Sequence, residues 1–126
     1  MRRTLVMVVI ALAFLLTACA PPAKTVSITS FGCAGGKIFC YAPAALTVPS
    51  GTKVVWKNTT GAPHTVTRCT VAACGVSGGT GTDTHFGSPT INPGQTYAFT
   101  FQGAGTYRYY CAVHGYTVMH ATVTVH

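Results

Sequence analysis

Hydrophobic and polar residues alternate with a period of two in several segments of the chain after residue 24. This alternation is typical of strands that bury one face, and clusters of glycine, proline and asparagine between the alternating segments indicate turns. No helical stripe of ten or more residues follows residue 24, so the pattern predicts an antiparallel β-sandwich or barrel of about seven short strands. The predicted strands are residues 25–29, 44–48, 52–58, 64–67, 96–101, 106–111 and 119–125.

The last two predicted strands have readable core faces. Alternation places Tyr107, Tyr109 and Cys111 on one face, and a second set on another face: Met119, Ala121, Val123 and Val125. The longest irregular stretch, residues 68–90, is rich in glycine and threonine, and we predict a surface loop there.

The N-terminus has a different pattern. Arg2 and Arg3 precede an uninterrupted apolar run from Leu5 to Leu16. Twelve residues at a rise of 1.5 Å cannot cross a bilayer core of about 30 Å as a helix, but they suit the apolar part of a signal peptide. We therefore predict that residues 1–18 are a signal peptide and that the protein is exported.

The residues after the apolar run leave two cleavage sites open. Leu16-Thr17-Ala18-Cys19 resembles the lipobox of bacterial lipoproteins, in which the cysteine becomes the lipid-bearing first residue. Ala18-Cys19-Ala20 also fits the small-residue pattern cut by an ordinary signal peptidase. We favour lipidation, because a cysteine at this position is otherwise hard to explain. Residues 19–24 are then the anchor cysteine and a short tether, and residues 25–126 form one domain.

Charge excludes some partners. Without residues 1–18 the chain keeps 108 residues with six basic side chains and Asp83 as the single acid, a formal net charge of about +5. The basic residues are scattered, so we predict no nucleic-acid binding. The near-absence of acids favours anionic or neutral apolar partner surfaces over positively charged ones.

Six cysteines are present, and Cys19 belongs to the export signal. The other five leave one odd thiol. In an exported protein, Cys33–Cys40 and Cys69–Cys74 are the expected disulfides among three possible connectivities. A four-cysteine zinc site is the alternative, and it is disfavoured because neither spacing is of the short C-x₂-C type. Cys111 is left as a lone thiol.

The stretch "YYCAVHGYTVMH" gives that thiol unusual neighbours, with His114 and Met119 in the same short loop as Cys111. Two histidines and a cysteine in a plane, with a weak axial methionine, form the blue-copper electron-transfer site. One imidazole is missing from this set. His64, in "TTGAPHTVT", starts a predicted strand after a turn and can supply it.

With these residues the chain resembles a cupredoxin of the plastocyanin/pseudoazurin type from about residue 25 to 125. The resemblance rests on "LTVPSGTKVVWKN", "APHTV", "FGSPTINPGQTYAFTF", "GTYRYYCAVH" and "MHATVTV", and on the spacing C-x₂-H-x₄-M. It implies an all-β, Greek-key antiparallel β-sandwich that binds one copper ion in a type 1 site. The implied ligands are His64, Cys111, His114 and Met119, with His114 reaching toward solvent.

The chain departs from the family near two ligands. Thr65 follows the first histidine where the family usually has asparagine, and a threonine hydroxyl can replace only part of that function. Val118 and His120 flank Met119 where the family favours glycine. We expect no metal binding by the remaining histidines: His85, His120 and His126.

The resemblance implies a single-electron carrier and not an enzyme, since four protein ligands leave no open position for a substrate. We expect redox proteins, such as a cytochrome or a membrane oxidoreductase or oxidase, to dock at a small apolar rim around His114. The expected rim residues are Gly61, Ala62, Pro63, Ala112, Val113, Gly115 and Tyr116. We expect a monomer, held by lipidated Cys19 at the outer face of a bacterial membrane, or free in the periplasm. Copper handling, for delivery or resistance, is the alternative function.

Overall fold

The computed structural model describes residues 19–126, so the predicted signal peptide lies outside the described residues. Among residues 19–126 there is no helix long and apolar enough to cross a membrane. The regular elements of this part of the chain are eight short strands, one 3-10 turn and one four-residue helix.

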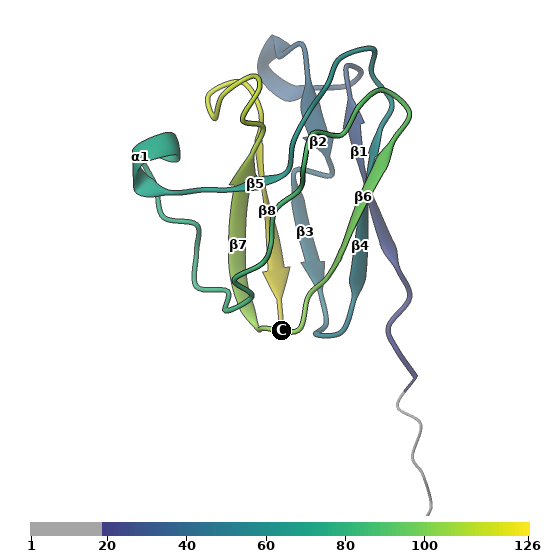
Figure 1. Ribbon diagram of the computed structural model, residues 1–126, viewed down its shortest axis with the longest axis vertical. Coiled ribbons are helices and arrows are strands. Elements are labelled where there is room, and N and C mark those ends of the chain that lie inside the picture. Colours follow the sequence, from purple (N-terminus) through teal and green to yellow (C-terminus); the bar gives the residue numbers. More distant parts are fainter. Residues whose placement is uncertain (1–18) are drawn as a thin grey trace, which may run out of the picture.

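Two four-stranded sheets face each other in a sandwich (Figure 1). One sheet has the order β2-β1-β4-β6 and the other β3-β8-β7-β5. The strands are β1 (Lys24–Thr29), β2 (Cys40–Ala42), β3 (Ala45–Val48), β4 (Lys53–Asn58), β5 (Thr67–Arg68), β6 (Thr96–Thr100), β7 (Gly105–Tyr110) and β8 (His120–Val125). The 3-10 turn is η1 (Ala34–Gly36), and the helix is α1 (Val71–Cys74).

The predicted all-β sandwich is confirmed, but its sheets are mixed. β1 pairs with β4 and β3 with β8 in parallel, and the other four strand pairs named for these sheets are antiparallel. Alternation has a period of two in either kind of pairing, so the sequence pattern does not distinguish them. The parallel pairs arise from the path of the chain between the sheets. After β2 the chain crosses to the other sheet for β3 and then returns to the first sheet for β4, as in a Greek-key connection.

Aromatic rings fill the space between the sheets. Trp56 of β4 is fully buried and its ring packs against Phe86, Phe101 and Tyr109. Its indole N–H donates a hydrogen bond of 3.1 Å to the Tyr109 hydroxyl. The two predicted core faces of the last strands are confirmed, since all of their members are buried: Tyr107, Tyr109, Cys111, Met119, Ala121, Val123 and Val125.

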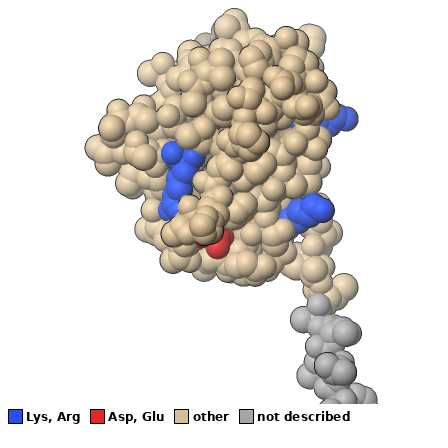
Figure 2. Space-filling view, in the orientation of Figure 1, with Lys and Arg blue, Asp and Glu red and all other residues tan. Residues whose placement is uncertain are grey.

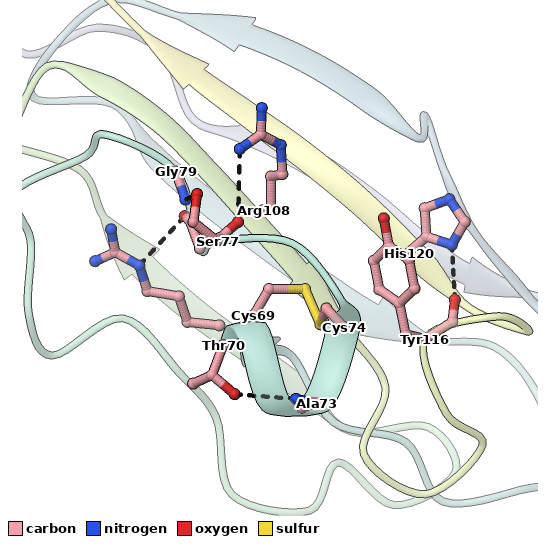
Figure 3. Close-up of a disulfide and its surroundings, with 11 residues drawn as sticks. Cys69, Thr70, Ala73, Cys74, Ser77, Gly79, Arg108, Tyr116 and His120 are labelled. Atoms are coloured by element: carbon pink, nitrogen blue, oxygen red, sulfur yellow. Dashed lines mark hydrogen bonds between the residues drawn. A yellow bond between two sulfur atoms is a disulfide. The ribbon is translucent and has the colours of Figure 1, made fainter.

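Both predicted disulfides are present, Cys33–Cys40 and Cys69–Cys74. Figure 3 shows the second disulfide, which joins the residue two positions before helix α1 to the last residue of that helix. The Thr70 hydroxyl caps the first turn by accepting a hydrogen bond from the Ala73 N–H. The predicted surface loop 68–90 therefore contains a short helix and a disulfide. The Arg68 guanidinium also donates to the carbonyls of Gly81 and Asp83, at 2.6 and 2.9 Å, and holds the loop against the second sheet.

The two ends of the sandwich carry different segments (Figure 1). The loop between β7 and β8 lies at one end, together with the loop that follows β1. The chain before β1 leaves at the other end, where the C-terminus also lies. There the Ser50 N–H donates to the His126 carbonyl at 2.8 Å, and the Gly51 N–H donates to the Phe101 carbonyl at 2.7 Å. We call these the loop end and the tether end.

Candidate metal centre

His64 is fixed by an isolated backbone bridge and does not belong to a regular strand. Its N–H donates to the Ile91 carbonyl at 3.1 Å, and its carbonyl accepts from the Ile91 N–H at 2.8 Å. β5 begins three residues later, so the predicted strand 64–67 is wrong except at Thr67. The His64 side chain is fully buried and therefore points inward.

The loop from Cys111 to Met119 is closed by its own backbone. The Cys111 N–H donates to the Met119 carbonyl at 3.0 Å, the Gly115 N–H donates to the Cys111 carbonyl at 2.9 Å, and the Met119 N–H donates to the Gly115 carbonyl at 3.1 Å. Gly115 has a φ of +84°, a conformation that favours glycine. The loop thus holds Cys111 and Met119, both fully buried, beside a partly exposed His114.

Three donor atoms converge at the loop end. Cys111 Sγ lies 3.7 Å from His64 Nδ1 and 3.4 Å from His114 Nδ1. The ligand atoms of these three residues all lie within 4.8 Å of one another, so one ion can contact all of them. A thiolate and two imidazoles suit copper. The buried Met119 side chain belongs to the same hydrophobic core cluster as Cys111. The predicted approach of His64 to the late loop is confirmed.

Comparisons with known proteins identify the family of the chain. The family model described as copper binding proteins, plastocyanin/azurin family, matches residues 28–126. The chain belongs to this family. It is 38% identical over 98 residues to plastocyanin of Lactuca sativa, covering 72% of this chain and 90% of that protein. It is 31% identical over 86 residues to plastocyanin of Scenedesmus fuscus, covering 68% and 85%.

Solved structures of the family share the fold. A purple cupredoxin from Nitrosopumilus maritimus superposes with a TM-score of 0.62 at 27% identity, over 82% of this chain and 99% of that one. An amicyanin variant in its Cu(I) form superposes with a TM-score of 0.59 at 31% identity, over 86% of each chain. The predicted cupredoxin fold is confirmed. Copper is the family's metal, and His64, Cys111, His114 and Met119 are arranged as a type 1 copper site.

The electrostatics of this cupredoxin site favour a neutral first histidine. Burial, with a smaller effect of the neighbouring His114 imidazole, lowers the pKa of His64 to about 4. A neutral imidazole has a free lone pair, which is the form that binds a metal. At neutral pH His64 is therefore ready to bind without losing a proton.

Thr65 joins the two ligand segments in this cupredoxin. Its N–H lies 3.4 Å from Cys111 Sγ, as a donor to the sulfur. Its hydroxyl oxygen accepts from the Ala112 N–H at 2.8 Å, and its carbonyl accepts from the buried Tyr41 hydroxyl. Burial raises the pKa of Tyr41, and Cys111 and Tyr109 add to the shift, so this phenol stays a donor. Threonine therefore joins the segments at the position where the family usually has asparagine.

Two residues that contact the histidines were not singled out by the sequence pattern. The Phe39 ring centroid lies 4.8 Å from that of His64 and 4.8 Å from that of His114. The Cys33–Cys40 disulfide closes the loop that carries it. The Thr60 hydroxyl lies 2.8 Å from His64 Nε2. The one available sequence signal for Phe39 was its position beside Cys40, which forms a disulfide.

The other histidines lie outside the group of donor atoms. His85, His120 and His126 are all exposed. His120 stacks on Tyr116 with a centroid distance of 4.4 Å, and its Nδ1 lies 2.7 Å from the Tyr116 carbonyl, which can only accept (Figure 3). This contact occupies one ring nitrogen of His120, the first residue of β8.

Proposed function

We propose that this chain is an exported type 1 copper protein that carries single electrons between redox partners. The residues that would hold the copper ion are His64 and His114 through Nδ1, Cys111 through Sγ, and Met119 through its thioether. The observation that carries the proposal is the buried Cys111 sulfur with an imidazole Nδ1 at 3.4 Å and another at 3.7 Å. No enzymatic activity is proposed.

A copper ion held by these donors supplies a one-electron couple between Cu(I) and Cu(II). The protein would contribute donor residues that its own backbone hydrogen bonds hold in place. His64 is held by its backbone bridge to Ile91, and the Cys111 loop is closed by three backbone hydrogen bonds. Since Cys111, His64 and Met119 are fully buried, the partly exposed His114 edge is the proposed route for electrons.

The surface around His114 supports docking through apolar contacts. Val113, beside the histidine, is 51% exposed. The disulfide-closed loop that places Phe39 on the histidine rings also exposes Ile38, at 67%. The single acid, Asp83, lies at the tether end, where its carboxylate accepts from the backbone of Gln102 and Gly103 at 3.0 Å. Lysine and arginine side chains are scattered in Figure 2, so we propose a weak, mainly apolar docking face for redox proteins.

We also propose that Cys19 is lipidated and holds the domain at the outer face of a membrane. The Pro21 ring packs over Gly51 at the tether end, where a Cβ built on Gly51 would lie 3.5 Å from Pro21 Cδ. An anchor at Cys19 therefore points the His114 edge away from the membrane, toward approaching partners.

Intact mass spectrometry of the membrane fraction tests the anchor. We expect a chain that begins at Cys19 and carries acyl groups, because one lipid chain gives marginal binding and stable anchoring takes more. An unmodified chain beginning after Cys19 would contradict the lipidation. The redox proposal does not depend on this result.

Voltammetry in the presence of a Cu(I) chelator tests the function. A carrier keeps its copper through repeated cycles, because the same buried donors hold the ion in both states. We expect a reversible one-electron wave with unchanged copper content. If the chelator removes the copper after the first reduction, the result would instead indicate copper handling.

A further inference from the structure

The outer nitrogen of His64 has a side-chain partner. Nδ1 faces Cys111 Sγ at 3.7 Å, and Nε2 faces the hydroxyl oxygen of Thr60 at 2.8 Å, in a buried environment. A neutral imidazole carries one proton, so one nitrogen donates and the other accepts. Which nitrogen is free for a metal depends on whether the Thr60 hydroxyl accepts from His64 or donates to it.

Asn58 sets the direction of the Thr60 hydroxyl. The Asn58 side-chain nitrogen donates to the Ala62 carbonyl at 2.8 Å and to the Ile91 carbonyl at 2.9 Å, and carbonyl oxygens only accept. Its side-chain oxygen therefore faces Thr60, where it accepts from the Thr60 N–H at 3.0 Å and lies 2.9 Å from the hydroxyl oxygen. The Ala62 carbonyl is a second acceptor for the hydroxyl, at 3.2 Å, and the Ala62 N–H donates to the hydroxyl oxygen at 3.2 Å. Both carbonyl oxygens near the hydroxyl can only accept, so its proton points at one of them and a lone pair of Thr60 faces His64.

We propose that Thr60, oriented by Asn58, is a positioning residue that fixes the tautomer of His64. The hydroxyl accepts the Nε2 proton, so the lone pair of Nδ1 faces Cys111, where the metal binds. The inference rests on the proposed function in taking Nδ1 as the ligand atom. Neighbouring groups that hold the outer proton of a metal-bound histidine orient the ring and raise its basicity, and their loss commonly reduces metal affinity by 10- to 100-fold.

Packing prevents His64 from compensating by rotation. The Phe39 ring contacts the His64 ring edge to face, with an interplanar angle of 77° and a centroid distance of 4.8 Å. The His64 side chain is fully buried, so no water can replace the hydroxyl without rearrangement. A change at Thr60 therefore acts on the proton position and not on the placement of the ring.

Three substitutions separate this role from a structural one. Thr60→Val removes the hydroxyl and keeps the shape of the side chain, and Thr60→Ser restores the hydroxyl. Thr59→Val is the matched control, because the neighbouring Thr59 hydroxyl donates to the Ile28 carbonyl at 2.8 Å and contacts no proposed ligand. Imidazole ¹⁵N chemical shifts of the metal-free protein report which nitrogen of His64 carries the proton.

We expect a protonated Nε2 in wild type, Thr60→Ser and Thr59→Val, and a substantial population protonated at Nδ1 in Thr60→Val. Copper(II) affinity, measured by competition, should fall 10- to 100-fold in Thr60→Val alone. An Nδ1 proton in metal-free wild type would overturn the proposal, even if Thr60→Val failed to fold. Wild-type shifts and affinity in a folded Thr60→Val, or an equal loss in Thr59→Val, would also overturn it. The ¹⁵N measurement needs no copper, so it is independent of whether the protein carries electrons.

Discussion

Copper-loaded protein in which Cys111 is replaced by serine is expected to lose its intense visible colour completely. That colour comes from charge transfer between a thiolate and copper, and a serine oxygen does not supply it. Cys111 is the one buried free cysteine among residues 19–126, because Cys19 is exposed and the other four cysteines form disulfides. The measurement is the visible spectrum at one equivalent of copper(II), before and after a reductant.

The control for this substitution is Cys19→Ser, which removes the other cysteine that forms no disulfide. We expect the control to keep the full absorption and to bleach reversibly. Serine is close in size to cysteine, so Cys111→Ser should keep the fold, and the far-ultraviolet circular dichroism should be unchanged. Colour that persists in Cys111→Ser would mean that another thiol binds the metal.

The second large effect is expected from Trp56→Ala, which should lower the free energy of unfolding by about 3–5 kcal/mol. Trp56 is fully buried. Its ring centroid lies 5.5 Å from that of Tyr97 and 5.7 Å from that of Tyr109. Truncation leaves a large cavity between the sheets. It also removes the donor to the Tyr109 hydroxyl, which is buried.

Denaturant unfolding of the metal-free protein measures this loss. Trp56→Phe is the matched variant, since it keeps an aromatic ring but no N–H donor, and we expect a smaller loss than for alanine. A change of less than about 1 kcal/mol in Trp56→Ala would contradict the account of the core, because cavity formation at a packed site costs more than that.

Sequence pattern predicts this sandwich well where strands are long and alternate clearly. β4, β6, β7 and β8 are such strands, and each lies within one or two residues of its predicted bounds. β2 was missed because it has three residues, from Cys40 to Ala42, and Pro43 follows it. A run this short has no readable period.

The metal centre could be predicted in part. The spacing of Cys111, His114 and Met119 lies within one loop, so local sequence already brings these donors together. His64 lies 47 positions before Cys111, and the sequence could only offer it as an imidazole able to complete the set, because its place depends on the bridge to Ile91. The contacts of Phe39 and Thr60 with the histidine rings depend on how distant loops meet, which no local pattern reports.

The most direct test of the ligand assignment is a crystal structure of the copper-loaded protein with anomalous scattering recorded at the copper absorption edge. We predict one peak at the loop end, bonded to Sγ of Cys111 and to Nδ1 of both His64 and His114, with the Met119 sulfur at a longer distance. A peak at exposed histidines such as His120, with the Cys111 sulfur unbound, would contradict the account.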